Sequence, residues 1–192
     1  MTRETEQRLL QNIHDGSRTA MRELYDRYSG YAMAVVMRYV PDRDDASDIL
    51  QEAFIKIFTG VARVEYRGEG SLKSWIARVA ANEALCFLRR RGNITFTDDF
   101  PDEPDCDEPD IGSISNADLQ RMIASLPEGY RVILNMYVFG QMSHKEIAAE
   151  LGISPSTSAS QFFHAKKMLA RMIREHCNGN PVVLYNESSE MI

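Results

Sequence analysis

The chain has 192 residues and 44% of them are hydrophobic, which is enough to bury one core or two small ones. Its formal charge of −6 argues at first against a nucleic-acid partner, but that charge is unevenly distributed. Residues 1–96 carry 15 basic and 13 acidic side chains, residues 97–117 carry eight acidic and no basic ones, and residues 118–177 carry seven basic and five acidic ones. Two mildly basic blocks therefore flank an acidic segment, and the overall charge does not exclude DNA binding.

Composition argues against several other classes of protein. The three cysteines are odd in number, widely spaced and not in a CxxC arrangement, so neither a disulfide framework nor a zinc site is predicted. The four histidines accompany no nucleophile or ligand cluster, so we expect no enzyme, no metal, no cofactor and no small-molecule substrate. Since no signal peptide is recognisable and no apolar run is long enough to cross a bilayer, we expect a cytoplasmic protein.

Three helices are predicted in the first 58 residues. Residues 3–14 place apolar side chains on one face, and a longer amphipathic helix runs from Ser17 to Pro41. Residues 44–58 have the most regular apolar stripe, and acidic residues stand at their start, where the helix dipole favours them. The opposite face of this third helix is polar, and composition alone predicts that it is solvated. Its members are Asp48, Gln51, Glu52 and Lys56.

Residues 60–70 are predicted to form a loop, and Ser71 to begin a helix that ends near Arg91. We interpret Trp75 as a core residue of this helix. Three arginines precede Gly92 and suit either the negative end of the helix dipole or a phosphate contact. The following segment is rich in acid and proline, so it is predicted to be a linker without a core of its own, and a passive tether is the simplest interpretation.

Residues 143–173 have the signature of a helix-turn-helix. Ser143 and Glu146 form a capping box, Gly152 supplies a left-handed stop, and Ser154 caps a second helix that begins at Pro155. We expect Ile153 to be buried in the turn. An ordinary helical hairpin with a polar outer face is the alternative. Candidate DNA contacts on the second helix are Ser156, Thr157, Ser160, Gln161, Phe163, His164 and Lys167.

Several of these stretches together resemble one family. DDASDILQEAFIKIF at 44–58, YRGEGSLKSW at 66–75 and IARVAANEALCFLRRR at 76–91 resemble region 2 of the extracytoplasmic-function (ECF) sigma factors of the sigma-70 family. LPEGYRVIL at 126–134, followed by the helix-turn-helix, resembles their region 4. The resemblance implies an all-α fold of two small helical domains: region 2 in 1–92, an acidic flexible linker in 93–117, region 4 in 118–177 and a disordered tail in 178–192.

The resemblance also implies a function and its sites. An ECF sigma factor binds core RNA polymerase and promoter DNA, initiates transcription without enzyme activity of its own, and is commonly held by an anti-sigma factor that is often membrane-anchored. The polar face of 44–58 would dock on the polymerase clamp helices, and the loop would capture a base flipped from the −10 element. The −10 candidates are Tyr66, Arg67, Gly68, Ser71, Asn82, Arg89, Arg90 and Arg91.

Other implications of the resemblance concern the linker and the −35 element. The linker would thread the basic cleft of the polymerase, where its acids would mimic nucleic acid. The helix-turn-helix would recognise the −35 element, but Ala159, Gln161 and His164 stand where the family often has basic residues, which leaves the promoter sequence open. A repressor or activator that binds DNA without polymerase is the main alternative, and an enzyme is a weaker one.

Overall fold

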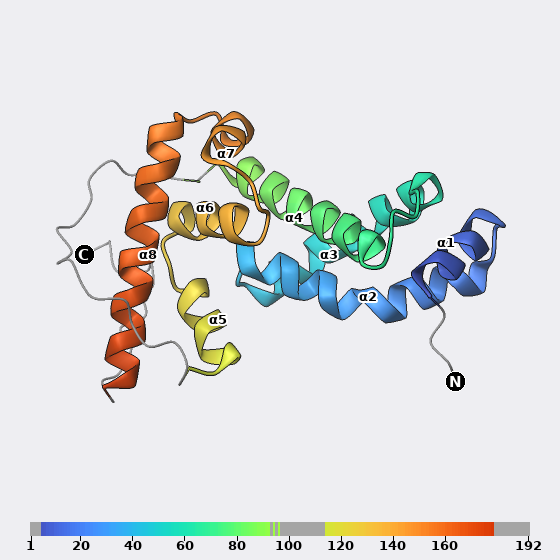
Figure 1. Ribbon diagram of the computed structural model, residues 1–192, viewed down its shortest axis with the longest axis horizontal. Helices are drawn as coiled ribbons and strands as arrows, with labels where there is room; N and C mark the ends of the chain where they lie inside the picture. Colours follow the sequence, from blue (N-terminus) through green and yellow to red (C-terminus); the bar gives the residue numbers. More distant parts are fainter. Residues whose placement is uncertain (1–4, 93, 95, 97–113, 179–192) are drawn as a thin grey trace. The chain divides into compact units, whose positions relative to one another are not determined.

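The computed structural model describes residues 5–92, 94, 96 and 114–178. All regular secondary structure within these residues is helical, and no strand occurs among them. The chain divides into two units, Met1–Gly92 and Asn93–Ile192 (Figure 1). The prediction of an all-α fold with two small helical domains is confirmed. Most of the predicted linker and nearly all of the predicted tail lie outside the described residues.

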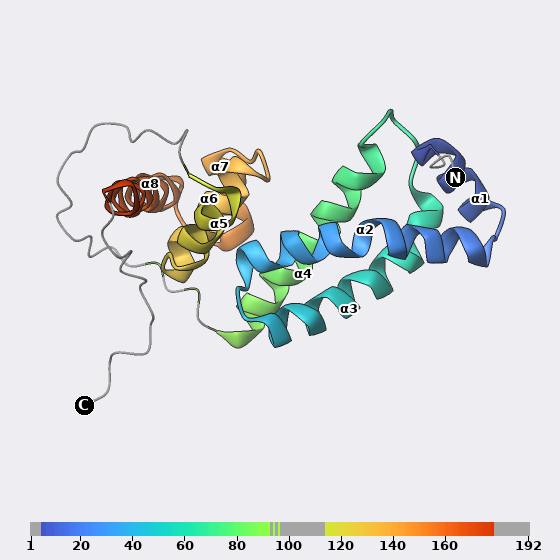
Figure 2. The same cartoon turned by 90° about the horizontal axis from the view of Figure 1, so that it is seen from below.

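The first unit is built from helices α1 (Glu6–His14), α2 (Arg18–Tyr39), α3 (Arg43–Gly60) and α4 (Ser71–Arg91), with a short 3-10 helix η1 (Val61–Arg63) after α3. Helices α2, α3 and α4 pack on one another, and α1 lies against α2 and η1 (Figure 2). Their apolar stripes meet in a common core. The largest fully buried side chains of this core are Leu9, Leu24, Val36, Ile57, Leu72 and Ile76.

Local capping explains where three of these helices begin. Thr5 and Ser17 each accept a hydrogen bond from the backbone N–H three residues on, and Asp42 accepts from the N–H groups of Asp44 and Asp45 at 3.0 and 2.9 Å. Helix α4 begins at Ser71 as predicted, but its N-cap is Gly70, which has a φ of 87° and no side chain to offer. Its free N–H groups therefore need a partner from elsewhere in the fold.

The second unit contains α5 (Asn116–Ala124), α6 (Glu128–Val138), α7 (His144–Leu151) and α8 (Pro155–Cys177). The long helix α8 packs against α5, α6 and α7. The turn between α5 and α6 is held by Arg131, which is 8% exposed and donates to the carbonyl oxygens of Ala124 and Leu126 at 3.2 and 2.7 Å. The core of this unit is formed by Met122, Ile123, Leu126, Tyr130, Leu134, Ala165, Met168, Met172 and Ile173.

The helix-turn-helix has the local geometry that its sequence predicts. The Ser143 Oγ accepts from the N–H of Glu146 at 3.3 Å, and the Glu146 carboxylate accepts from the N–H of Ser143 at 2.8 Å. The Ser143 hydroxyl also donates to the Glu146 carboxylate at 2.7 Å, and this bond, followed by the one from the Ser143 N–H, lowers the pKa of the Glu146 carboxyl group. Gly152 has a φ of 69°, and Ser154 caps α8 through the N–H of Thr157 at 2.9 Å. Ile153, however, is half-buried rather than buried as predicted.

Candidate protein- and nucleic-acid-binding surfaces

The outer face of α3 is more mixed than its sequence suggested. Asp48, Gln51 and Glu52 are exposed, as expected for a polar face. Ile55 is also exposed, to 57% of its surface, and it lies one turn beyond Gln51. Ile55 was not included in the predicted polar face because it is hydrophobic. A single accessible aliphatic side chain among polar ones is normal on a protein surface, so this composition suits either a solvated face or an interface.

Lys56, the fourth residue predicted for this face, is engaged with α4. Its Nζ donates to the Glu83 Oε1 at 2.6 Å, and the Glu83 side chain is 8% exposed whereas that of Lys56 is 56% exposed. The hydrogen bond to Glu83 raises the pKa of the Lys56 amine. Lys56 therefore joins α3 to α4, and its amine would have to leave a buried carboxylate to contact a partner.

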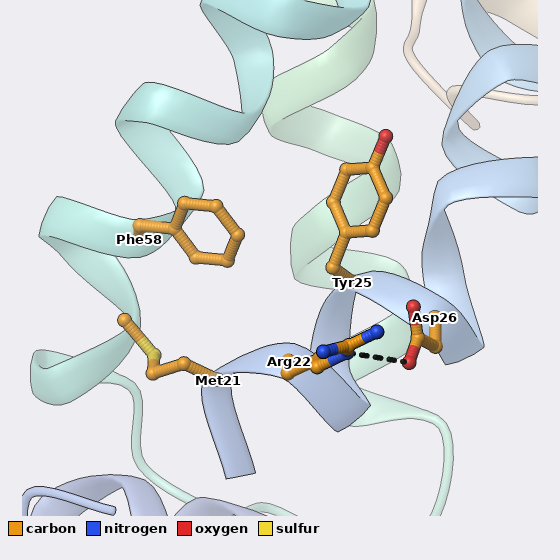
Figure 3. A pocket seen from close by; sticks show the side chains of 5 residues that line it. All are labelled: Met21, Arg22, Tyr25, Asp26 and Phe58. Atoms are coloured by element: carbon orange, nitrogen blue, oxygen red, sulfur yellow. Dashed lines mark ion pairs between the residues drawn. The ribbon is translucent and has the colours of Figure 1, made fainter. Parts of the chain in front are cut away.

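An open apolar groove runs between α2 and α3 beside this face. Figure 3 shows Met21 and Tyr25 of α2 opposite Phe58 of α3. The Tyr25 and Phe58 ring centroids are 6.5 Å apart, and Tyr25 is 43% exposed. An ion pair between Arg22 and Asp26, at 3.8 Å, borders the groove on α2. The Tyr25 ring also packs edge-on against that of Phe54, with centroids 4.8 Å apart, so Tyr25 lies on the rim of the helical core.

The loop before α4 and the first turns of that helix enclose a hollow of about 570 Å³. Trp75 lines it and is half-buried, so the prediction that Trp75 is a core residue is wrong. The indole packs on Gly60, where an added Cβ would lie 3.2 Å from the ring. The other lining residues are Arg63, Val64, Glu65, Arg67, Ser71, Ser74 and Arg78. Arginines around an aromatic face suit the phosphate and base of a nucleotide.

Sequence reasoning found only part of this hollow. Arg67 and Ser71 were among the −10 candidates, and the structure joins them, because the Arg67 N–H donates to the Ser71 Oγ at 3.3 Å. Arg63, Ser74 and Arg78 were missed. Ser74 and Arg78 follow Ser71 at intervals of three and four residues, which is the spacing of one helix face and could have found them.

The remaining −10 candidates lie outside the lining of this hollow. Tyr66 is 38% exposed on the loop, Gly68 stands beside it with a φ of 117°, and Asn82 is exposed on α4. Arg89 and Arg90 are exposed in the last turn of α4. Their neighbour Arg91 instead bonds the Asp45 carboxylate at the start of α3, at 2.8 Å. This pair ties the end of α4 to α3, so Arg91 is less available to DNA than its position in sequence suggested.

In the second unit, α8 presents an outer surface that is polar and aromatic. Phe163 is 48% exposed, and the Lys167 Nζ lies 4.9 Å from its ring centroid. His164 is half-buried, with its ring stacked on that of Tyr130 at 6.4 Å. At the N-terminus of the helix, Ser156 and Thr157 hydrogen-bond the Ser154 hydroxyl, at 2.6 and 2.9 Å. Ser160, one turn before His164, is half-buried.

Gln161 is fully buried, so the prediction that it contacts DNA is wrong. The buried stripe of α8 recurs at intervals of three and four residues, and position 161 falls on it. The stripe consists of Ser158, Gln161, Ala165, Met168 and Met172. The hydroxyl of its other polar member, Ser158, is 3.0 Å from the Nδ1 of His144. Helical geometry, rather than side-chain polarity, places both residues inside.

Across residues 5–92 and 114–178, no helix is both long and apolar enough to cross a membrane. In the same parts of the chain, no group of three or more histidine, cysteine, aspartate or glutamate side chains is placed to hold a metal ion.

Both units match known protein families. Residues 24–94 match the family model of Sigma-70 region 2, and residues 116–169 match that of Sigma-70, region 4. The RNA polymerase sigma-H factor of Pseudomonas aeruginosa is 28% identical over 188 residues, which cover 91% of this chain and 96% of that protein. The ECF RNA polymerase sigma-E factor of Haemophilus influenzae is 26% identical over 185 residues, which cover 88% of this chain and 96% of that protein. The ECF RNA polymerase sigma-E factor of Escherichia coli is 28% identical over 185 residues, which cover 88% of this chain and 95% of that protein.

A solved structure is also similar. It is that of the sigma factor RpoE in complex with the anti-sigma factor NepR from Bartonella quintana. The alignment covers 80% of this chain and 96% of that one, with 19% sequence identity and a TM-score of 0.47.

Proposed function

The chain belongs to the sigma-70 family, in its extracytoplasmic-function group, and we infer that it binds core RNA polymerase and directs promoter-specific initiation of transcription. One observation carries this conclusion: region 2 and region 4 occur in the same chain, in that order, each on its own helical unit. A repressor or activator needs a helix-turn-helix to bind its operator, but it has no use for region 2. The family match therefore decides between the two alternatives.

We propose that the exposed face of α3 docks on the polymerase. Asp48, Gln51 and Glu52 supply polar contacts there, and Ile55 supplies an apolar one. Fully burying an exposed aliphatic side chain contributes about 1.5–3 kcal/mol, so Ile55, which is 57% exposed, would contribute about 1–2 kcal/mol. Exposed charges contribute mainly to specificity and to the association rate. The apolar groove beside this face would extend the contact onto Tyr25 and its neighbours.

We propose that the loop before α4 and the adjoining hollow bind the opened −10 element. Flipping a base out of a duplex costs a few kcal/mol of lost stacking and pairing, so a pocket must recover that cost by stacking and hydrogen bonds. The half-buried indole of Trp75 offers an aromatic wall, while Arg63 and Arg78 offer charge to the phosphate groups. Asn82, exposed further along α4, can donate and accept hydrogen bonds at a base edge.

We propose that the outer surface of α8 recognises the −35 element. Ser156 and Thr157 lie at the helix N-terminus, which favours phosphate oxygens, and Lys167 adds a flexible charge on the same helix. Exposed Phe163 and half-buried His164, whose rings meet edge to face, would contact base edges in the major groove. Because Gln161 is buried, fewer side chains than the sequence suggested are available to determine which bases are recognised.

A sigma-factor function also has consequences for the catalytic groups, the cellular location and the regulation of this protein. The polymerase forms the phosphodiester bonds, so this protein needs no catalytic group of its own. We propose that it acts in the cytoplasm, where core polymerase and promoters are found, and that an anti-sigma factor regulates it. The acidic linker would enter the polymerase cleft, as the family resemblance implies.

Run-off transcription tests the function directly. Purified core polymerase would be mixed with a promoter library, with and without the protein, and the transcripts sequenced. We expect transcripts from a subset of promoters that core polymerase alone does not use. In parallel, the protein without polymerase would be titrated onto the selected promoters. Tight sequence-specific binding there, together with unchanged transcription by core polymerase, would instead identify a conventional repressor or activator.

A further inference from the structure

Helix α4 begins without a cap from its own sequence neighbourhood. Its N-cap Gly70 has no side chain, and the first turn contains no acidic residue. The N–H groups at the start of a helix have no partner within the helix and carry its positive end. This junction matters because Gly70 is also the last residue of the loop that we assign to the −10 element.

The missing cap comes from α1, more than 60 residues earlier in the chain. The Glu6 Oε2 accepts a hydrogen bond from the Gly70 N–H at 2.8 Å and a longer one from the Leu72 N–H at 3.4 Å. Its other oxygen, Oε1, accepts from the Tyr28 hydroxyl at 2.9 Å. One carboxylate thus joins α1, α2 and the start of α4. Burial, and secondly the bond to Glu6, raises the pKa of Tyr28 to about 12, so the hydroxyl remains a donor at neutral pH.

Two hydrogen bonds attach the loop before α4 to Ser71, the residue between Gly70 and Leu72. The Arg67 N–H donates to the Ser71 Oγ at 3.3 Å, and the Ser71 N–H donates to the Gly68 carbonyl oxygen at 3.1 Å. Ser71 lies between the two residues that the carboxylate contacts. The placement of residues 66–68 relative to α4 therefore depends on where Gly70 is fixed, and Gly70 is fixed from α1.

We propose that Glu6 is a positioning residue for −10 recognition, acting through Gly70 and Leu72 to hold the base-capturing loop. The inference rests on the proposed function of that loop. It makes α1, which precedes the part of the chain that matches region 2, a component of promoter opening. Helix α1 is itself anchored by Leu9, Leu10 and Ile13, which are buried, so the Glu6 carboxylate is not needed to attach the helix.

Three variants separate positioning from general stability. Glu6→Ala removes all three hydrogen bonds. Glu6→Gln keeps an amide oxygen that can accept from Gly70 and Leu72, while the Tyr28 hydroxyl can turn to accept from the amide nitrogen. Tyr28→Phe leaves the hydrogen bonds from the Gly70 and Leu72 N–H groups and removes only the one that the Tyr28 hydroxyl donates to Glu6. Asp15→Asn is the matched control, because it removes one negative charge from the exposed end of the same helix.

Each variant would be assembled with core polymerase and incubated with single-stranded oligonucleotides randomised at the −10 positions, and the bound fraction would be sequenced. Core affinity and thermal unfolding would be measured alongside. For Glu6→Ala we expect core affinity close to that of the parent and a loss of about tenfold in preference at the captured base, equivalent to 1.4 kcal/mol. Glu6→Gln and Asp15→Asn should retain the preference of the parent, and Tyr28→Phe should lose part of it.

Two results would contradict the reasoning in different ways. If the parent holoenzyme shows no base preference in this pool, the loop does not recognise the −10 element, and the proposed function of the loop is wrong together with the inference. If the parent shows a preference and Glu6→Ala keeps it, with or without a lower unfolding temperature, Glu6 contributes to stability alone. Should Glu6→Ala fail to fold, Glu6→Leu would replace it, because leucine fills most of the same volume but cannot accept from the Gly70 and Leu72 N–H groups. An unchanged preference in Glu6→Leu would overturn the positioning role in the same way.

Discussion

Replacing Lys56 by methionine should destabilise the first unit, although Lys56 lies on an exposed helix face. The substitution keeps an unbranched stem and leaves the Glu83 carboxylate, 8% exposed, without the amine that it contacts at 2.6 Å. A hydrogen bond to a charged group contributes about 1.5–3 kcal/mol, and the 56% exposure of Lys56 reduces this through solvent screening. We therefore expect Lys56→Met to lower the free energy of unfolding by about 1–2 kcal/mol.

A double-mutant cycle isolates the pair. Lys56→Met and Glu83→Met together replace both charges by side chains of similar length, and such replacement of an ion pair is often nearly neutral. The double variant should thus be more stable than Lys56→Met alone. Urea unfolding followed by the fluorescence of Trp75, the single tryptophan of the chain, measures each free energy within the first unit. Gln51→Met is the control, because it places the same side chain on the exposed face of the same helix.

The reasoning fails if Lys56→Met lies within about 0.5 kcal/mol of the parent, which is the range of ordinary surface substitutions. A coupling energy of zero in the cycle would have the same meaning. Lys56 would then be an ordinary surface residue, available to a partner as its sequence position suggested.

Three other predictions address the remaining surfaces. Gln51→Arg combined with Glu52→Lys should weaken binding to core polymerase in a titration while stability stays within about 0.5 kcal/mol of the parent; unchanged affinity would make this face plain solvated surface. His164→Ala should flatten the base preference at one or two −35 positions of a promoter library, and a profile with the shape of the parent's would show that His164 does not contact bases. Lys167→Ala should weaken binding to every promoter and reduce the slope of log affinity against log salt concentration by about one unit. Gln141→Gly should raise stability in thermal unfolding by up to about 1 kcal/mol, because Gln141 has a φ of 53°, and a loss of stability would show that its side chain contributes more than this backbone strain costs.

The helices could be predicted because their signals are local. The capping box of α7, the left-handed Gly152 and the cap at Ser154 each act within three or four residues of the chain, so the sequence displays both partners together. The apolar stripe of α3 predicted a helix over 44–58, and the observed helix extends only one residue before and two after that range. The fold class follows from such stripes because each one has to be buried against another.

The fate of individual side chains on α8 could not be predicted in the same way. Polarity suggested that Gln161 faces outward, but the neighbours of α8 are supplied by α5, α6 and α7, and their arrangement decides which positions are covered. The inner stripe passes through Ser158 and Gln161 before it reaches Ala165 and Met168. A helix that packs on three others over much of its length covers some polar positions, and local sequence does not say which ones.

The polar side chains that link helices were hidden for a different reason, the distance between their partners in the chain. Glu6 reaches Gly70, Lys56 reaches Glu83 and Asp45 reaches Arg91, and each of these residues looks like a surface residue beside its own neighbours. The fold uses Lys56 and Arg91 to hold α3 against α4, and Glu6, on the anchored helix α1, to fix the start of α4. A binding surface predicted from sequence must therefore leave out the charged side chains that already pair with other residues of the fold. On α3 this leaves Asp48, Gln51, Glu52 and Ile55 as the residues whose substitution tests docking without also opening the helical bundle.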